Sequence, residues 1–332
     1  MKNKNLIVEK GFIDEPVPEN IDLKEEILRL KKEKNAVILA HYYVDGQIQD
    51  IADFVGDSLE LARKAAQTDA QIILFAGVHF MAETAKILSP QKKVLIPDLK
   101  SGCPLADSMP AAEFAKFKEK YPEHFVVTYV NTTAEIKALS DITCTSSNAA
   151  DIIASLPEDT KIIFGPDKNL GSYIKGITGR DMILWDGACP VHQRFSLEKL
   201  LKLKQEYPDA LVLAHPESDK QILLKADVIG STSKLLKFAI KTEAKNLIIA
   251  TEPGIIHQMQ KAAPDKNYIP LPPDTNKPMS ICVNMKKHTL EKVYNALKFE
   301  APEVVLEQDL IEKSYKPIKR MLDVSLKLGI IK

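Results

Sequence analysis

The chain has no excess of charge of either sign, because 45 lysines and arginines balance 45 aspartates and glutamates. A surface that binds nucleic acid normally carries excess positive charge, so we expect no nucleic-acid partner. Long apolar runs are also missing. Stretches such as 36–40 and 210–214 are far shorter than the roughly 20 residues of a membrane-spanning helix. Residues 1–10 contain no apolar signal core, so we expect a cytoplasmic protein with no membrane partner.

Cysteine is scarce, and none of the four cysteines forms a CxxC pair. The sequence therefore lacks the usual spacing of zinc ribbons and ferredoxins. A chain of 332 residues, 45% hydrophobic and 27% charged, can form two or three domains and bury large cores without disulfides. In the cytoplasm we expect these cysteines to be free, metal-bound or catalytic.

Short apolar runs alternate with amphipathic stretches along the whole chain. Strands are predicted at 36–40, 72–75, 94–96, 125–129, 161–164, 182–185, 210–214, 246–250 and 268–271. Helices are predicted at 59–66 and 233–241, and also at 21–33 and 310–328 near the ends. Pro317 is expected to kink the last helix or to divide it in two. Such alternation predicts α/β architecture with parallel sheets that are covered on both faces.

A repeated spacing divides the chain into three similar parts. A polar residue at a strand end is followed 17 residues later by a hydroxyl near a helix start, in the pairs His41 and Ser58, Tyr129 and Ser146, and His215 and Thr232. Two cysteines share this register, since Cys103 precedes Tyr129 by 26 residues and Cys189 precedes His215 by 26. We interpret the pattern as three copies of strand, helix, strand, helix, strand, which end at Cys103, Cys189 and Cys282.

The repeat predicts three three-layer α/β/α domains with parallel sheets, related by pseudo-threefold symmetry around a central site. We expect a first domain at 1–108, with an N-terminal helical extension, a second at 109–193 and a third at 194–287. Residues 288–332 are expected to form a C-terminal helical segment that closes on the first domain. Ligand sites in parallel α/β folds gather beyond the carboxyl ends of strands, so these ends should share one pocket.

The same symmetry would direct three thiolates, from Cys103, Cys189 and Cys282, toward one centre. Thiolates ligate zinc or iron–sulfur clusters, and three of them satisfy three irons of a four-iron cluster. The fourth iron would then be open and could act as a Lewis acid. The alternative is that buried cysteines are small hydrophobic residues. We adopt that alternative for Cys144, which lies outside the repeat register.

Several short motifs are spread along nearly the whole chain: AHYY at 40–43, GDSLELA at 56–62, YVN at 129–131, TSSN at 145–148, GPDKNLG at 165–171, HPE at 215–217, GSTS at 230–233, and the cysteine turns. In combination, these motifs resemble the quinolinate synthase family. The resemblance implies condensation of iminosuccinate (iminoaspartate) with dihydroxyacetone phosphate to quinolinate, phosphate and water, in de novo NAD biosynthesis. It also implies a 4Fe–4S cluster with three cysteine ligands and three similar α/β/α domains. A functional link to the enzyme that supplies iminosuccinate is a further expectation.

The resemblance also implies roles for individual residues. The implied cluster ligands are Cys103, Cys189 and Cys282, the last supported more by the repeat register than by its local motif. The implied substrate contacts are His41, Ser58, Tyr129, Val130, Asn131, Ser146, His215, Pro216, Glu217 and Thr232. Ser147 is the alternative to its neighbour Ser146. The implied catalytic residues are Tyr43 and Glu217, which would move protons, and His192 beside the cluster ligands.

The chemistry of these residue types suits anionic substrates, although each has a plainer interpretation. Helix N-termini attract anions, and Ser58, Ser146, Ser231 and Thr232 are predicted at helix starts. The same residues could simply cap the helices, and one geometry can serve both purposes. His41 and His215 offer charge or hydrogen bonds. Glu217 offers a carboxylate for proton transfer, unless it is an exposed loop residue.

Two rival functions remain open from the sequence. An aconitase-like hydro-lyase would use the same open iron without a condensation partner. A structural or redox-sensing metal protein would have neither an anion pocket nor turnover. The remaining histidines have no repeat register and are assigned to the surface or to packing; they are His79, His124, His257 and His288.

Overall fold

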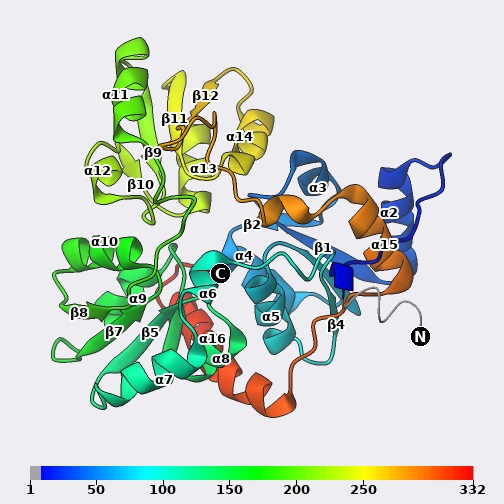
Figure 1. Cartoon of the computed structure of the whole chain (residues 1–332), viewed down its shortest axis with the longest axis horizontal. Coiled ribbons are helices and arrows are strands. Elements are labelled where there is room, and N and C mark those ends of the chain that lie inside the picture. The colour runs from blue at the N-terminus through cyan, green and yellow to red at the C-terminus, as the bar shows by residue number, and fades with distance from the viewer. Residues whose placement is uncertain (1–8, 332) are drawn as a thin grey trace.

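The computed structural model describes residues 9–331 and contains three parallel sheets of four strands each (Figure 1). The first sheet has the order β2 (Phe54–Gly56), β1 (Ala36–His41), β3 (Ile72–Ala76), β4 (Lys93–Leu95). The second has the order β6 (Ile142–Cys144), β5 (Phe125–Tyr129), β7 (Ile162–Gly165), β8 (Met182–Leu184). The third has the order β10 (Val228–Ile229), β9 (Leu211–Ala214), β11 (Asn246–Ala250), β12 (Asn267–Pro270). We call the parts of the chain that contain these sheets the first, second and third repeats.

Helices connect the strands and cover the sheets. The first repeat contains α2 (Leu23–Glu33), α3 (Gly46–Ile51), α4 (Ser58–Gln67), α5 (His79–Leu88) and α6 (Pro104–Asp107). The second contains α7 (Ala111–Glu119), α8 (Ala134–Ala138), α9 (Ala149–Ser155) and α10 (Lys168–Thr178). The third contains α11 (Leu197–Glu206), α12 (Lys220–Leu223), α13 (Thr232–Lys241), the 3-10 turn η1 (Pro253–Ile255) and α14 (Ile256–Ala262). The chain continues with the 3-10 turn η2 (Met285–Lys287), α15 (Leu290–Phe299) and α16 (Gln308–Lys327).

The predicted α/β fold with three parallel sheets is confirmed, and each predicted strand is present within a residue or two of its expected bounds. The sequence reading missed one strand in each repeat, namely β2, β6 and β10. Each lies at the edge of its sheet beside the first strand of the repeat. These strands have only two or three residues, which is too short for a recognisable apolar pattern.

The edge strands are joined to their sheets by the same device in all three repeats. An aspartate side chain just before the edge strand accepts a backbone N–H of the first strand: Asp53 from Ile38 at 2.8 Å, Asp141 from Val126 at 2.7 Å, and Asp227 from Val212 at 2.7 Å. The backbone N–H of each aspartate donates to the carbonyl of the same partner. The three repeats therefore match in side-chain detail as well as in topology.

The three repeats lie around a common centre, with their sheets directed toward it (Figure 1). Helix α15 packs against α2 of the first repeat, whereas α16 packs against α8 and β6 of the second and also against α5 of the first. The sheets do not fix the residue at which a domain ends, so the domain limits given above stay predictions. The outermost of these limits, residues 1 and 332, lie outside the described residues.

The C-terminal helix corrects one expectation. Helix α16 continues through Pro317 as a single element, so a division into two helices is wrong, whereas the alternative effect of Pro317, a kink, stays a prediction. The reason is packing: Ile311, Ile318 and Met321 are buried on both sides of the proline. This buried face stabilises the helix although proline removes one backbone donor.

Among the described residues, no helix combines the length and apolar character that a membrane crossing needs.

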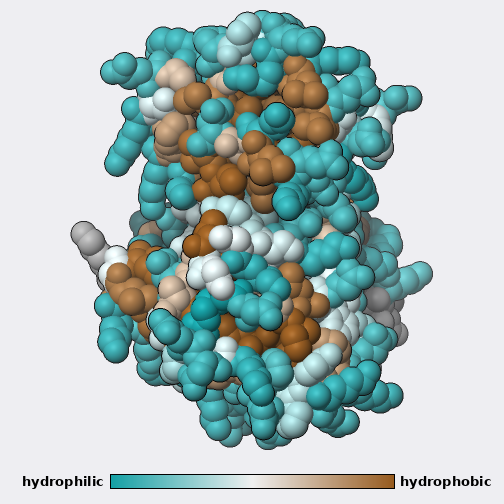
Figure 2. Space-filling model, turned by 90° about the vertical axis from the view of Figure 1, so that its left-hand side faces the viewer, coloured by the Kyte–Doolittle hydropathy of each residue, from teal (hydrophilic) through white to brown (hydrophobic). Residues whose placement is uncertain are grey.

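Apolar side chains gather on the face that the second and third repeats form together (Figure 2). A groove runs between α10 and α12 and is lined in part by Tyr173, Ile177, Leu223 and Leu224. Asn169 also lines this groove, and its Nδ2 donates a hydrogen bond of 3.0 Å to the carbonyl oxygen of Glu217. The two repeats therefore contact each other where Glu217 leaves the end of β9.

One buried histidine gives the fold a predictable acid sensitivity. His288 Nε2 donates to the carbonyl oxygen of Gly77 at 2.7 Å, and its Nδ1 is buried without a partner among the described residues. Burial lowers the pKa of His288 to about 4. The unfolded chain takes up this proton below about pH 6.5, so the native state loses relative stability as the pH falls from 6.5 toward 4.

We therefore expect His288→Gln to remove the contribution of His288 to this acid sensitivity. The amide can still donate to Gly77 but does not titrate. The linkage amounts to about 2 kcal/mol at pH 5 for a full shift of this size. Thermal unfolding midpoints of both proteins at pH 7 and pH 5 would measure it. An equal drop in both proteins would show that His288 does not contribute.

Candidate active site

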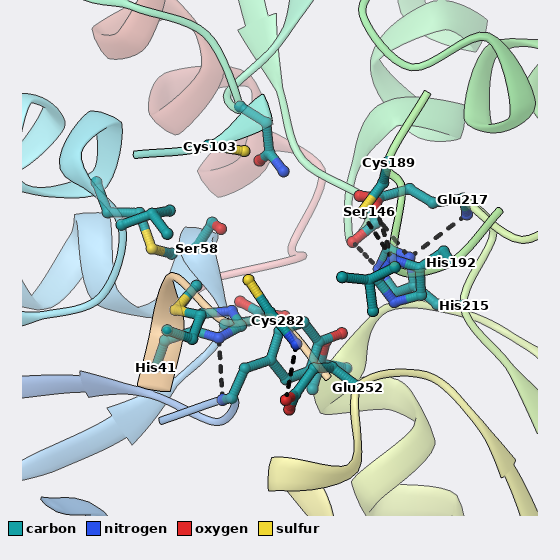
Figure 3. A pocket seen from close by; sticks show the side chains of 18 of the residues that line it. His41, Ser58, Cys103, Ser146, Cys189, His192, His215, Glu217, Glu252 and Cys282 are labelled. Carbon is teal, nitrogen blue, oxygen red and sulfur yellow. Dashed lines mark hydrogen bonds and ion pairs between the residues drawn. The ribbon is translucent and has the colours of Figure 1, made fainter. Parts of the chain in front are cut away.

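The carboxyl ends of the strands in all three sheets face one cavity (Figure 3). All predicted site residues line it except Val130 and Pro216; they are His41, Tyr43, Ser58, Cys103, Tyr129, Asn131, Ser146, Cys189, His192, His215, Glu217, Thr232 and Cys282. The three copies of the spacing therefore converge, as the repeat predicts.

Two predicted substrate contacts lie outside the cavity wall. Val130 is buried and lines a small neighbouring hollow together with Ser58 and Phe80. Its backbone N–H donates to the carbonyl oxygen of Cys144 at 2.8 Å. Pro216 is buried between His215 and Glu217, which both line the cavity. A substrate role for these two residues stays a prediction.

Helix capping does not explain the hydroxyls of Ser58 and Thr232. Helix α4 is capped by Asp57, whose carboxylate accepts the N–H groups of Leu59 and Glu60. Helix α13 is capped by Ser231, the residue before Thr232. Because the preceding residue makes the cap in both helices, the two hydroxyls lie in the first turn and line the cavity. The Ser58 hydroxyl therefore remains available for other contacts at the positive end of a helix, whereas Thr232 Oγ1 lies 2.9 Å from the Tyr43 hydroxyl.

The two neighbouring serines of the second repeat have different partners. Ser146 lines the cavity, and its Oγ lies 3.2 Å from Nε2 of His215. Ser147 Oγ instead donates to the carboxylate of Asp57 at 2.8 Å and so links the second repeat to the first. The geometry therefore favours Ser146 over Ser147 as the residue that a bound molecule would touch.

Glu217 lies at the centre of a buried polar network. It is 2% exposed, so the interpretation of Glu217 as an exposed loop residue is wrong. Tyr129 donates its hydroxyl to Oε1 at 2.6 Å, and Nδ1 of His192 lies 2.9 Å from Oε2. Burial by itself would raise the pKa of Glu217, but the electrostatic influence of the neighbouring His215 and the hydrogen bonds from His192 and Tyr129 lower it below its usual value. Glu217 is therefore an ionised acceptor.

Burial sets the charge state of the other polar groups. It lowers the pKa of His41 to about 4 and that of His215 to about 3, so both imidazoles are neutral at pH 7. They therefore offer hydrogen bonds, and an anion bound beside them would raise their pKa values. Burial also raises the pKa of Tyr43 well above its usual value. Its hydroxyl lies 2.9 Å from Thr232 Oγ1 and 2.6 Å from Thr251 Oγ1.

Cys103, Cys189 and Cys282 lie on different sides of the cavity (Figure 3). Burial raises the pKa of the Cys103 thiol to about 12, and it also raises the pKa values of the other two thiols. A metal would therefore have to displace thiol protons when it binds. Cys144 is different, because it lies fully buried in β6 within the hydrophobic core and does not line the cavity.

Two buried carboxylates support the cysteine loops, and the sequence reading missed both. Asp167 caps α10 with Oδ1 and accepts the backbone N–H of Cys189 with Oδ2 at 2.7 Å. Glu252 accepts from Gly254 with Oε2 at 2.7 Å and from Cys282 with Oε1 at 3.3 Å. Asp167 lies two residues after the end of β7, and Glu252 lies two residues after the end of β11. These strands are the third in chain order within their repeats. The first repeat has Val78 there, so only two copies carried the signal.

We expect Asp167→Asn to loosen the Cys189 loop. An amide offers one oxygen and one NH₂ group, so it cannot accept from both the helix and Cys189. A buried N–H left without a partner costs about 1–3 kcal/mol. We expect the iron of the predicted cluster to pass to a chelator several-fold faster than in the unaltered protein. Asp186→Asn, in an exposed ion pair with Lys168, is the control and should leave the rate unchanged.

Comparison with known proteins identifies the family. Residues 25–323 match the family described as Quinolinate synthetase A protein. A protein named quinolinate synthase from Synechocystis sp. is 57% identical to this chain, and the match covers 92% of this chain and 96% of the relative. One from Nostoc sp. is 55% identical, with 92% of this chain and 94% of the relative covered. One from Gloeothece citriformis is 56% identical, with 92% of this chain and 94% of the relative covered. The resemblance inferred from the motifs is thus confirmed, and the chain belongs to the quinolinate synthetase A family.

Proposed function

We propose that the protein is a quinolinate synthase, which condenses iminosuccinate with dihydroxyacetone phosphate to give quinolinate, phosphate and water. One observation carries this proposal: three thiols and three pairs of polar residues, one set from each repeat, line a single cavity. The relatives that match nearly the whole chain bear the name of this enzyme. The products would serve de novo NAD biosynthesis.

The donor set of the cavity fits a 4Fe–4S cluster held by Cys103, Cys189 and Cys282. A single ion needs ligand atoms that nearly touch, yet among the described residues the three thiols do not form a group within 4.8 Å of one another. A four-iron cube is several ångströms across, so widely placed thiols suit it better. When bound, the cluster would supply an iron without a cysteine ligand, a Lewis acid that polarises a hydroxyl for loss as water.

The walls of the cavity suit two small anions. Ser58, Ser146 and Thr232 present hydroxyls at or near helix starts, where backbone N–H groups favour negative charge. His41 and His215 add neutral imidazoles, and Tyr129 adds a phenol. Asn131 Oδ1 is buried without a hydrogen-bond partner among the described residues, and a bound molecule would satisfy it. We propose these residues, with Val130, Pro216 and Glu217 on the same loops, as the substrate contacts.

Proton transfer would use a connected chain of hydrogen bonds. Tyr129 donates to Glu217, Glu217 contacts His192, and Nε2 of His192 lies 3.0 Å from Thr251 Oγ1. Thr251 in turn bonds Tyr43. The three predicted catalytic residues, Tyr43, His192 and Glu217, therefore belong to one network that spans all three repeats. Such a network allows a carboxylate to take a proton at one point of the cavity while a phenol donates at another.

An assay of the anaerobically purified, iron-replete protein tests this proposal. Quinolinate should form only when iminosuccinate and dihydroxyacetone phosphate are both present. An aconitase-like hydro-lyase would instead dehydrate a hydroxy acid without a second substrate, and a structural or redox-sensing protein would show no turnover. Either result would overturn the proposed function.

The proposed substrates also suggest a partner and a location. An imine hydrolyses in water, so a functional link to the enzyme that supplies iminosuccinate would limit its loss. We propose that both enzymes act in the cytoplasm. If the link is direct, quinolinate formation by the coupled pair should exceed that from imine released into bulk solution.

A further inference from the structure

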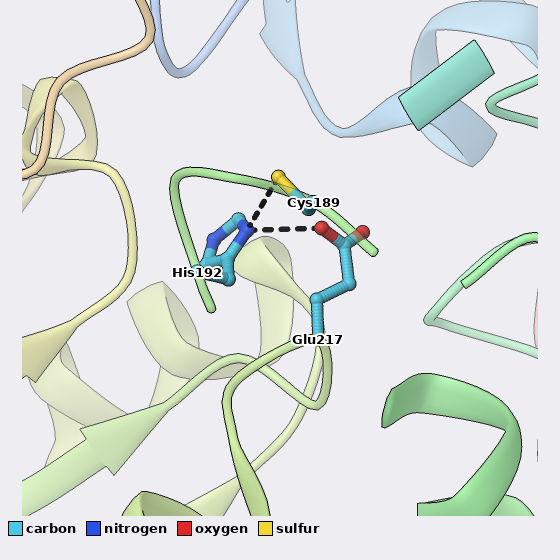
Figure 4. A group of neighbouring side chains, drawn as sticks. All are labelled: Cys189, His192 and Glu217. Atoms are coloured by element: carbon cyan, nitrogen blue, oxygen red, sulfur yellow. Dashed lines mark hydrogen bonds and ion pairs between the residues drawn. The ribbon is translucent and has the colours of Figure 1, made fainter. Parts of the chain in front are cut away.

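Cys189, His192 and Glu217 form a compact group on one side of the cavity (Figure 4). Their ligand atoms all lie within 4.8 Å of one another, and no other group of at least three such side chains does so among the described residues. His192 Nδ1 lies 3.3 Å from Cys189 Sγ and 2.9 Å from Glu217 Oε2. In a tetrahedral zinc site the corresponding distances are about 3.6 Å and about 3.3 Å. The side chains would need to separate only slightly to receive an ion.

The chemistry of the group also suits zinc. A thiolate, an imidazole nitrogen and a carboxylate oxygen are the three ligand types that Zn²⁺ uses in proteins. Two of the three ligands, His192 and Glu217, are already held in place by hydrogen bonds from outside the group. His192 Nε2 lies 3.0 Å from Thr251 Oγ1, and the second oxygen of Glu217 accepts from Tyr129. Such outer hydrogen bonds fix the tautomer and direction of metal ligands. The adjoining cavity leaves space for a water molecule as the fourth ligand.

We propose that the cluster-free protein binds one Zn²⁺ ion, or a similar divalent transition-metal ion, through Cys189, His192 and Glu217. The thiol of Cys189 releases its proton to solvent. Because Nδ1 of His192 faces the ion as a ligand, the ring proton lies on Nε2, facing Thr251. Cys103 and Cys282 take no part. A consequence that rests on the proposed function follows: Cys189 cannot serve the ion and the cluster together, so zinc bound here blocks cluster assembly.

Zinc titration of the intact, iron-free protein under anaerobic conditions tests the site directly. We expect one ion per chain. Affinity should fall by more than about 100-fold in Cys189→Ser, His192→Gln and Glu217→Gln, because each removes a direct ligand and loss of an outer partner alone costs about 10- to 100-fold. Cys103→Ser, Cys282→Ser and Cys144→Ala should bind zinc as tightly as the unaltered protein. Circular dichroism would verify that each variant is folded. Weaker binding in Cys103→Ser or Cys282→Ser would mean that the three thiols hold the ion, and the proposal would fail. It would also fail if the unaltered protein bound no zinc.

Reconstitution with iron and sulfide tests the competition. Zinc added first should lower iron incorporation in the unaltered protein, and His192→Gln should incorporate iron equally with and without zinc. Equal incorporation by the zinc-loaded and zinc-free unaltered protein would overturn the exclusion. Failure of the unaltered protein to take up iron without zinc would count against the proposed function instead, and the zinc titration would still decide the metal site.

Discussion

Replacing any one of Cys103, Cys189 and Cys282 with alanine should abolish cluster assembly and quinolinate formation. Each of these thiols lines the central cavity, and each comes from a different repeat. A four-iron cluster with three protein ligands has no spare cysteine nearby, because the fourth cysteine is buried in β6. Loss of one thiolate would leave two irons without a protein ligand.

Cys144→Ala is the matched control and should keep both iron and activity. Its side chain packs in the hydrophobic core and contributes no atom to the cavity. Iron and sulfide per chain after anaerobic reconstitution would separate the four variants. A Cys144→Ala protein that folds but holds no iron, or a Cys282→Ala protein that holds a full cluster, would refute this set of ligands.

Glu217→Gln should keep the cluster and bind substrate, but its turnover should fall by about 10²- to 10⁴-fold, the usual contribution of a general acid–base group. The amide oxygen can still accept from Tyr129, so the network should remain assembled. The amide cannot take up a proton, and Glu217 is the carboxylate in contact with both His192 and His215. A role in holding the loop alone would leave turnover nearly normal.

Rates of quinolinate formation by iron-replete proteins would measure this effect. Glu198→Gln is a suitable control, because Glu198 is exposed on α11 and pairs only with Lys202 among the described residues. It should behave like the unaltered protein. A cluster-replete Glu217→Gln enzyme with near-normal turnover would remove Glu217 from the mechanism.

The sequence was most informative where a pattern occurred three times. The spacing of 17 residues placed His41, Tyr129 and His215 at equivalent strand ends, and parallel sheets bring such ends together. A single pair with this spacing would have predicted little. The repeat also separated the three cavity cysteines from Cys144 before any contact was known.

Features that involve only one to three residues in each repeat were not predicted from the sequence. The edge strands were too short for an apolar pattern. The aspartates that join them to the sheets are single residues and form no such pattern either; they are Asp53, Asp141 and Asp227. The aspartates do recur at nearly constant spacing, and the repeat could have revealed them. Asp167 and Glu252 were harder to find, because the first repeat has a valine at the corresponding position.

Contacts between the repeats could not be read from spacing at all. The path from Tyr129 through Glu217, His192 and Thr251 to Tyr43 joins residues that are distant in the chain. It depends on how the three sheets are tilted against one another and on which rotamers the packing permits. Likewise, only the folded chain shows that Asp57 and Ser231 cap their helices and leave Ser58 and Thr232 to the cavity.

The most direct test of the central site is anomalous diffraction at the iron absorption edge, from crystals of the reconstituted protein grown without oxygen. We expect one iron–sulfur cluster in the cavity, bonded to Cys103, Cys189 and Cys282, with one iron that has no cysteine ligand. Iron located elsewhere, bound through Cys144, or held by fewer than three of these cysteines would contradict the proposed enzyme.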